Sequence, residues 1–307
     1  MYDIIGDIHG YNNSLEALLV KLGYDKHAGY YKHPERKAIF CGDIIDRGPG
    51  IRQTLQLVKS MCDNNSAYMI TGNHEYNAIL FNTKSPKGRW LRKRIPKNIK
   101  QFSQTLAAFE KNPQELEIYI DWFRTLPIFL EFDNFRVIHA CWDYELIEFL
   151  KKELPQSKFT YEFILRAATK NTPEYNAIED LIKGKEIKLP KGLSYFDKDG
   201  NIRHRIRFQW WRILCNETYR SIAVNYEKQV PDQAVNQRFI KNHIPYRADD
   251  IPVFFGHYWR RGEPKLISQN VCCLDFSIAK RERLAAYRFD GERTLSNSKF
   301  VFTECVD

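Results

Sequence analysis

The sequence predicts an α/β fold with a largely parallel sheet, organised as one domain over residues 1–307. Two observations support this prediction. In the first half of the chain, short apolar segments alternate with segments in which aliphatic residues recur every three to four positions, a pattern typical of βαβ units. The length of 307 residues, with 43% hydrophobic and 28% charged residues, suits a globular protein with a sizeable core.

Three short apolar segments near the start of the chain are expected to form strands, at residues 2–5, 37–40 and 66–70. Helical spacing of aliphatic residues predicts a helix after each of the first two strands, over residues 15–22 and 50–61. Asn13 or Ser14 would cap the first helix, and Gly23 would end it. Each strand leads into a polar loop that contains glycine, and ligands of open α/β sheets bind at such carboxyl ends of strands.

The rest of the chain is expected to add two helical insertions and further strands. The insertions would cover about residues 84–125 and 145–235, where prolines interrupt helical patterns. A hairpin is expected between them, over residues 128–138. Residues 197–201 superficially resemble a calcium-binding loop, but the twelfth position is Phe208 rather than Glu, so we expect a hairpin turn. The last strands are expected at residues 253–255, 271–274 and 284–289.

Positive charge is concentrated in two segments. The chain has 47 basic and 38 acidic residues, a net charge of +9. Residues 84–100 contain eight lysines or arginines and no acid, and residues 203–212 form a second cluster with Trp210 and Trp211. Such clusters suit an anionic partner, whether phosphate groups, nucleic acid or an acidic protein. Trp90 and its basic neighbours would also suit a nucleic acid strand, a partner that we do not favour over a solvated insertion beside the active site.

The composition indicates a cytoplasmic protein without a membrane partner. No apolar segment approaches the length of a membrane span, and the mean hydropathy is −0.52. The first residues lack the basic and apolar regions of a signal peptide. The seven cysteines are odd in number and include no Cys-X-X-Cys pair, so we expect free thiols in a reducing compartment. The sequence leaves the oligomeric state open.

Side chains that bind metal ions follow several of the expected strands. Because the carboxyl ends of neighbouring parallel strands meet, we expect these side chains to converge. Two aspartates, three histidines and one asparagine would form a mixed nitrogen and oxygen set, which suits Mn, Fe, Zn or Co better than Ca or Cu. Two cations separated by about 3.5–4 Å can hold a hydroxide between them and bind a phosphoryl group. The candidate ligands are Asp7, His9, Asp43, Asn73, His139 and His257.

Residues with roles in phosphoester cleavage lie beside the candidate ligands. Asp46 and Arg47 follow Asp43 by three and four positions, and His74 follows Asn73 directly. The planar guanidinium of Arg47 matches phosphate oxygens. The imidazole of His74 could protonate the leaving oxygen, with Asp46 orienting it and keeping it cationic.

The three loops also resemble the motifs of a known family. GDIHG at residues 6–10, GDIIDRG at residues 42–48 and GNHE at residues 72–75 resemble motifs of the calcineurin-like metallophosphoesterases, in particular the phosphoprotein phosphatase group. The separations, 36 residues from Asp7 to Asp43 and 30 from Asp43 to Asn73, are also similar. The resemblance is close over residues 1–80 and returns at residues 136–143 and 251–290.

The resemblance implies a fold and a ligand set. The fold would be a calcineurin-like α/β/β/α sandwich of four layers, with the helical insertions added to it. The cofactor would be two divalent metal ions, with Mn²⁺ as first choice and Fe, Zn, Co or Ni as alternatives. One ion would be held by Asp7, His9 and the bridging Asp43, and the other by Asp43, Asn73, His139 and His257. The resemblance also implies phosphate binding by Arg47 and Asn73, and an acid pair formed by His74 and Asp46.

Two departures from the family pattern bear on the substrate. Protein phosphatases of this group usually carry His-Gly-Gly at the fourth motif, and symmetrical diadenosine tetraphosphate hydrolases carry His-Ala-Gly, whereas this chain has HACW at residues 139–142. A second phosphate-binding arginine is expected in the 118 positions between His139 and His257. The candidates are Arg205, Arg207 and Arg212, and we favour the segment from Arg207 to Arg212 without choosing within it.

These observations predict an enzyme that hydrolyses phosphoesters with two metal ions and a hydroxide that bridges them. Our first choice of substrate is a phosphomonoester on a protein or a nucleotide. The alternative is a dinucleoside polyphosphate, as for symmetrical diadenosine tetraphosphate hydrolases, followed by a nucleic acid end or a 2′,3′-cyclic phosphate. A degenerate fold that only binds anions is the non-enzyme alternative, disfavoured because every ligand position and the acid pair are filled.

Overall fold

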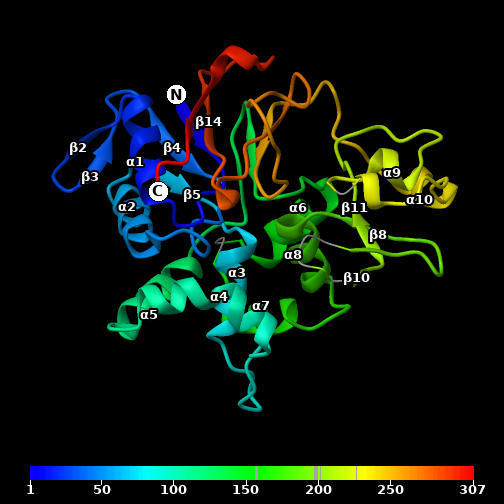
Figure 1. Ribbon diagram of the computed structural model, residues 1–307, viewed down its shortest axis with the longest axis horizontal. Helices are drawn as coiled ribbons and strands as arrows, with labels where there is room; N and C mark the ends of the chain where they lie inside the picture. The colour runs from blue at the N-terminus through cyan, green and yellow to red at the C-terminus, as the bar shows by residue number, and fades with distance from the viewer. Residues whose placement is uncertain (156–157, 197–199, 201, 226) are drawn as a thin grey trace.

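Two mixed sheets form the centre of the protein (Figure 1). The computed structural model describes residues 1–155, 158–196, 200, 202–225 and 227–307. The first sheet has five strands and the second has four. In order across the first sheet, the strands are β15 (Phe300–Glu304), β14 (Arg283–Phe289), β1 (Tyr2–Ile5), β4 (Lys37–Phe40) and β5 (Ala67–Met69). Across the second they are β13 (Val271–Cys273), β12 (Val253–Phe255), β7 (Arg136–Ile138) and β6 (Phe129–Glu131).

Alternating side chains on the strands explain why the sheets pack face to face. Ile4 of β1 and Ile39 of β4 belong to the same buried cluster as Val137 of β7 and Phe254 of β12. Successive side chains of a strand point to opposite faces, so Ile5 belongs to the other large cluster, which contains the helices. The two sheets therefore form the inner layers of the sandwich that the family resemblance implied.

Helices cover the outer face of the first sheet, and parts of the second insertion pack against the second sheet. On the first sheet, α1 (Asn12–Lys21) contacts β14 and β15, and α2 (Ile51–Asp63) contacts β5. On the second sheet, the ring of Trp210 lies 5.2 Å from that of Phe255 in β12. The backbone N–H of Ala140, just after β7, donates to the carbonyl of Leu181 at 3.1 Å. With these contacts the protein has four layers. The carboxyl ends of the central strands lie between the outer layers.

The two insertions extend from this sandwich as separate groups of elements (Figure 1). The first follows α3 (Asn73–Phe81) and contains α4 (Pro96–Ala108) and α5 (Pro113–Phe123). The second contains the helices α6 (Tyr144–Glu153), α7 (Tyr161–Ala167), α8 (Pro173–Lys183), α9 (Tyr219–Ile222) and η1 (Glu227–Gln229), followed by α10 (Gln237–Asn242). It also contains the short strands β8 (Glu186–Lys188), β9 (Tyr195–Phe196), β10 (Ile202–Arg203) and β11 (Arg205–Arg207).

Several elements differ from the sequence-based expectation. The first sheet is parallel only from β1 to β5, because β14 and β15 run antiparallel to their neighbours. The sequence analysis missed β15 and the hairpin of β2 (Asp25–His27) and β3 (Tyr30–Lys32). It also missed the strands of the second insertion and the short helices η2 (Ile278–Lys280) and η3 (Asn297–Lys299). Elements of two or three residues are too short to show a period. The turn expected at residues 197–201 lies outside the described residues, apart from Gly200.

The start of α1 has a different cap from the one expected. The helix begins at Asn12, and neither Asn13 nor Ser14 caps it with its own side chain. Instead, the Asp307 carboxylate accepts hydrogen bonds from the backbone N–H groups of Asn13 at 3.0 Å and Ser14 at 2.9 Å. A carboxylate from the far end of the chain thus satisfies the free N–H groups of the first turn.

None of the helices in the described part of the chain combines the length and the apolar character that crossing a bilayer requires.

Candidate metal centre and active site

The candidate ligands lie on loops at the carboxyl ends of five strands. Four loops follow β1, β4, β7 and β12 directly, and α3 begins shortly after β5. Parallel pairing of β1 with β4 and of β4 with β5 brings three of these loops to one edge of the first sheet. Parallel pairing of β7 with β12 brings the other two to the facing edge of the second sheet. All the side chains concerned are buried except that of His257, which is partly exposed.

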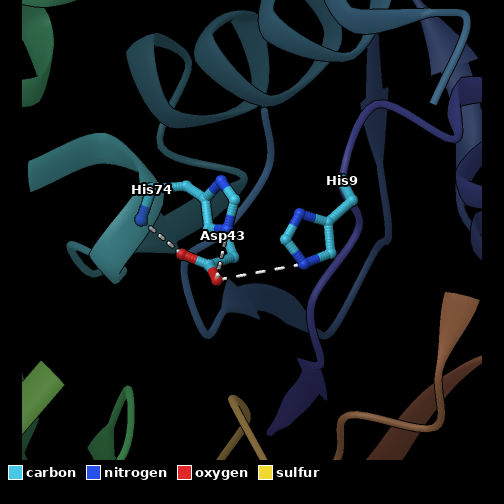
Figure 2. A group of neighbouring side chains, drawn as sticks. All are labelled: His9, Asp43 and His74. Carbon is cyan, nitrogen blue, oxygen red and sulfur yellow. Dashed lines mark hydrogen bonds and ion pairs between the residues drawn. The ribbon is translucent and has the colours of Figure 1, made fainter. Parts of the chain in front are cut away.

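The carboxylate of Asp43 lies at the centre of this group. Its Oδ2 atom is 3.4 Å from His139 Nε2 and 3.9 Å from both His9 Nε2 and His74 Nε2. Figure 2 shows the imidazoles of His9 and His74 turned towards this carboxylate. Asp43 belongs to two sets whose ligand atoms all lie within 4.8 Å of one another, one with His9 and His74 and one with His139 and His257. A carboxylate shared by two such sets has the position of a bridging ligand.

Backbone carbonyls fix the orientation of two histidine rings. His9 Nδ1 lies 3.0 Å from the carbonyl oxygen of Ile45, and His139 Nδ1 lies 2.7 Å from that of Cys41. With Nδ1–H donating to a carbonyl, each ring directs Nε2 towards Asp43. Histidines that bind metal ions are held in the same way by a hydrogen bond at the other ring nitrogen.

An unpaired nitrogen supports the presence of a cation. His257 Nε2 is buried and has no hydrogen-bond partner among the described residues. A buried polar atom without a partner is costly, and a metal ion would satisfy it. The backbone N–H of His257 lies 3.2 and 3.1 Å from the two carboxylate oxygens of Asp7. A Cβ atom on Gly256 would lie 1.8 Å from Asp7 Oδ1, so only glycine allows this approach.

Buried carboxylates also make the site attractive for cations. Burial raises the pKa of Asp7 well above its usual value, and the negative charges of Asp275 and Asp43 raise it further. Burial opposes the charged form of Asp43 too, but His139 and His74 hold its pKa well below the usual range. Carboxylates packed together away from water need compensating positive charge. The donor set therefore fits divalent cations, and the groups that could hold them are His9, Asp43 and His74, and Asp43, His139 and His257.

Strained backbone is concentrated in these loops. Twelve residues other than glycine have positive φ in the described chain, and five of them are candidate site residues. Such conformations cost about 1–3 kcal/mol each and persist only where the surrounding structure enforces them. The five are His9, Asp43, Asp46, Arg47 and His257, with φ between 49° and 70°.

The expected acid pair is in contact. His74 Nδ1 lies 2.5 Å from Asp46 Oδ2, and the hydroxyl of Thr105 on α4 donates to Asp46 Oδ1. Burial alone would lower the pKa of His74, but the charges of Asp43 and Asp46 raise it above the ordinary value. The ring directs Nε2 towards the Asp43 carboxylate, while the neighbouring Arg47 is exposed. Sequence reasoning missed Thr105, because nothing in the sequence connects α4 with a loop 59 positions earlier.

Glu75 is a second functional residue that sequence reasoning missed, although its motif was recognised. The side chain is fully buried, and its carboxylate accepts hydrogen bonds from the backbone N–H groups of Asp43 at 2.8 Å, Ile44 at 2.9 Å and Gly72 at 3.0 Å. It therefore joins the loop after β4 to the start of α3. Burial, with the charge of Asp43, raises its pKa to about 7. A glutamate three positions after the N-cap is the sequence signal of this arrangement.

The three candidates for the second phosphate-binding arginine make different contacts in the structure. Arg207 Nε donates to the carbonyl of Lys183 at 2.7 Å, and after burial its charge is the next cause of the low pKa of His257. Arg205 Nε lies 3.4 Å from a carboxylate oxygen of Glu186. Arg212 Nη2 lies 2.8 Å from Glu217 Oε1, within the second insertion. Among the three, Arg207 is the one whose charge lowers the pKa of the candidate ligand His257.

Comparison with known proteins agrees with this geometry. The family model of the calcineurin-like phosphoesterases matches residues 2–258, so the chain belongs to this family. Members of this family are named for phosphoester chemistry, and the family implies divalent metal ions.

Individual relatives match shorter stretches. The chain is 36% identical over 129 residues to an asymmetrical bis(5′-nucleosyl)-tetraphosphatase PrpE of Oceanobacillus iheyensis, covering 38% of this chain and 51% of the relative. It is 48% identical over 73 residues to the protein of the same name from a Geobacillus species, covering 24% and 30%. The matched stretches thus span about half or less of these relatives. A solved cold-active protein-tyrosine phosphatase from Shewanella is 16% identical, with coverage of 96% and 80% and a TM-score of 0.47.

Proposed function

We propose that this protein hydrolyses dinucleoside polyphosphates with two divalent metal ions, Mn²⁺ being the first candidate. The observation that carries the metal-dependent reaction is the Asp43 carboxylate, which lies within 3.4–3.9 Å of three imidazoles and joins two potential ligand sets. Bound divalent cations supply positive charge for the phosphoryl oxygens and lower the pKa of the attacking water. Iron, zinc, cobalt and nickel are the other metals that this donor set suits.

The chain's own residues bind the phosphoryl group and complete the proton transfer. The exposed guanidinium of Arg47 is free to pair with two phosphate oxygens, and Asn73 would hold the group from the start of α3. Arg207 would add a second guanidinium from the facing side. With Asp46 bonded to Nδ1, His74 would hold a proton on Nε2 and donate it to the oxygen that leaves.

The choice of substrate rests on the relatives. The sequence analysis put a phosphomonoester first, but the named relatives are asymmetrical bis(5′-nucleosyl)-tetraphosphatases, and this favours the dinucleoside polyphosphate alternative. Asymmetrical cleavage of diadenosine tetraphosphate would yield ATP and AMP, whereas symmetrical cleavage would yield two ADP. We expect the asymmetrical products. All seven cysteines are free, with Cys215 exposed, which supports the reducing cytoplasm as the location.

A substrate panel tests this proposal. The metal-free protein, reconstituted separately with Mn²⁺, Fe²⁺, Zn²⁺, Co²⁺ and Ni²⁺, would be assayed on diadenosine tetraphosphate, a phosphopeptide, p-nitrophenyl phosphate and a 2′,3′-cyclic nucleotide. We expect the highest kcat/KM for diadenosine tetraphosphate, with ATP and AMP as products and full loss of activity in chelator. A higher kcat/KM for the phosphopeptide would restore the phosphomonoester hypothesis. Full metal occupancy without turnover of any substrate would indicate an anion-binding module.

A further inference from the structure

The hydroxyl of Thr105, on α4 of the first insertion, contacts the acid pair. Thr105 is fully buried, and its hydroxyl donates to Asp46 Oδ1. The other carboxylate oxygen, Asp46 Oδ2, lies 2.5 Å from His74 Nδ1. An ionised carboxylate can only accept hydrogen bonds. One oxygen of Asp46 therefore accepts from Thr105 and the other from His74.

Two donors fix the plane of the Asp46 carboxylate, whereas one would not. The last torsion of an aspartate side chain has a broad, twofold energy profile, so a single hydrogen bond leaves the carboxylate able to rotate. Asp46 also lines a cavity of about 10 Å³, which has room for about one water molecule. The hydrogen bond from Thr105 keeps Oδ1 turned towards α4, and Oδ2 is then left facing His74.

Contacts with α3 hold α4 in place. Arg92, in the segment between the two helices, donates to Asn77 on α3 and to Gln101 on α4. A buried phenylalanine from each helix adds a ring contact at 5.1 Å. The helix that carries Thr105 is therefore joined to the helix that carries His74 in its first turn.

We propose that Thr105 is a positioning residue for the reaction. By holding the Asp46 carboxylate, it fixes the imidazole of His74 in the orientation from which Nε2 gives its proton to the leaving oxygen, as the bond from that oxygen to phosphorus breaks. The inference rests on the proposed metal-dependent hydrolysis, but not on the choice of substrate. It gives the first insertion a part in catalysis, although this insertion lies outside residues 1–80, where the family resemblance is close.

Removal of the Thr105 hydroxyl tests this role. Thr105→Val keeps the shape of the side chain, whereas alanine would leave space for a water molecule in place of the hydroxyl. We expect Thr105→Val to lower kcat by about tenfold on phenyl phosphate, whose leaving oxygen needs a proton, and by much less on p-nitrophenyl phosphate. KM should change little, because the lost interaction acts in the transition state. Thr105→Ser keeps the hydroxyl and should retain most of the activity on both substrates.

Thr54→Val is the matched control. Thr54, on α2, is as fully buried as Thr105, but its hydroxyl has no hydrogen-bond partner among the described residues. The same substitution there should leave the ratio of the two kcat values unchanged. In a His74→Asn background, Thr105→Val should have no further effect on kcat, since its hydroxyl acts through His74.

Proton NMR of the metal-free protein gives a readout that requires no turnover. The proton between His74 Nδ1 and Asp46 should give a downfield resonance, because this hydrogen bond is short and charge-assisted. Its loss in His74→Asn would assign it. We expect Thr105→Val to shift or broaden this resonance, and Thr54→Val to leave it unchanged.

The possible failures can be told apart. In Thr105→Val, equal losses of kcat on both phosphates, no loss on either, or an unchanged resonance would overturn the positioning role. A loss in His74→Asn that does not depend on the leaving group would refute the acid of the proposed function together with this inference. Hydrolysis of the two phosphates without cleavage of diadenosine tetraphosphate would refute the proposed substrate and keep the role of Thr105.

Discussion

The first 80 residues and the second insertion build different parts of the site by different means. In the first region, the loops follow strands of three or four residues, and the fully buried Glu75 joins two of them. In the insertion, strands of two or three residues carry arginines that share the partly exposed Glu186. On the proposed function, the first region would hold the groups that act on phosphorus, and the insertion would supply positive charge for the substrate.

Removal of the Asp43 carboxylate, which both ligand sets share, is the substitution expected to have the largest effect on activity. We expect Asp43→Asn to lower kcat by about 10³-fold or more, because the variant loses the charge that both ligand sets share. Turnover of p-nitrophenyl phosphate and the bound metal per chain measure the effect. Circular dichroism would show that the variant folds, and unchanged turnover would contradict the assignment of Asp43.

Substitution of His74 tests whether this residue donates a proton or binds a metal ion. We expect His74→Asn to lower kcat by about 10²-fold on phenyl phosphate, because its poorly leaving phenolate oxygen then receives no proton. The loss should be smaller on p-nitrophenyl phosphate, whose leaving group needs little protonation. Steady-state kinetics on both substrates and metal analysis check this prediction. Equal losses on both, accompanied by loss of metal, would make His74 a ligand.

A matched pair of glutamate substitutions compares how much one glutamate from each region contributes to the free energy of unfolding. Glu75→Gln should lower the free energy of unfolding by about 2 kcal/mol, because an amide cannot accept from all three backbone N–H groups that Glu75 binds. Glu186→Gln, in the insertion, should cost less than about 1 kcal/mol, since its ion pairs are partly solvated. Denaturant unfolding measures both values, and a larger cost for Glu186→Gln would reverse the comparison.

The smallest expected effect distinguishes two arginines of the insertion. Arg207→Gln should lower kcat/KM by about tenfold, because Arg207 is proposed to bind the phosphoryl group of the substrate and its charge influences His257. Arg212→Gln should leave kcat/KM unchanged, since its guanidinium pairs with Glu217 within the second insertion. Kinetics on diadenosine tetraphosphate check both variants. A loss confined to Arg212→Gln would move the second phosphate-binding role to that residue.

The central strands and the candidate ligands could be predicted because their signals are local. A buried strand, a glycine and a polar side chain lie within ten residues of one another, as for β1, Asp7 and His9. Parallel pairing then brings such loops together without further information. Family membership, confirmed by the match over residues 2–258, rests on the same loops.

The remaining features depend on contacts that join distant parts of the chain. Thr105 reaches Asp46 across 59 positions, and Asp307 caps α1 from 293 and 294 positions away. The choice between Arg207 and Arg212 depends on which carboxylate each guanidinium meets. The periodic pattern of apolar residues does not indicate contacts between distant residues. These residues could therefore be identified only from the fold.

Anomalous diffraction from a crystal soaked in Mn²⁺ tests the central claim most directly. Two peaks are expected, about 3.5–4 Å apart, with the Asp43 carboxylate between them. Asp7 and His9 should lie beside one peak, and Asn73, His139 and His257 beside the other. A soaked crystal with no peak near Asp43, or with these side chains turned away from the metal, would contradict the account.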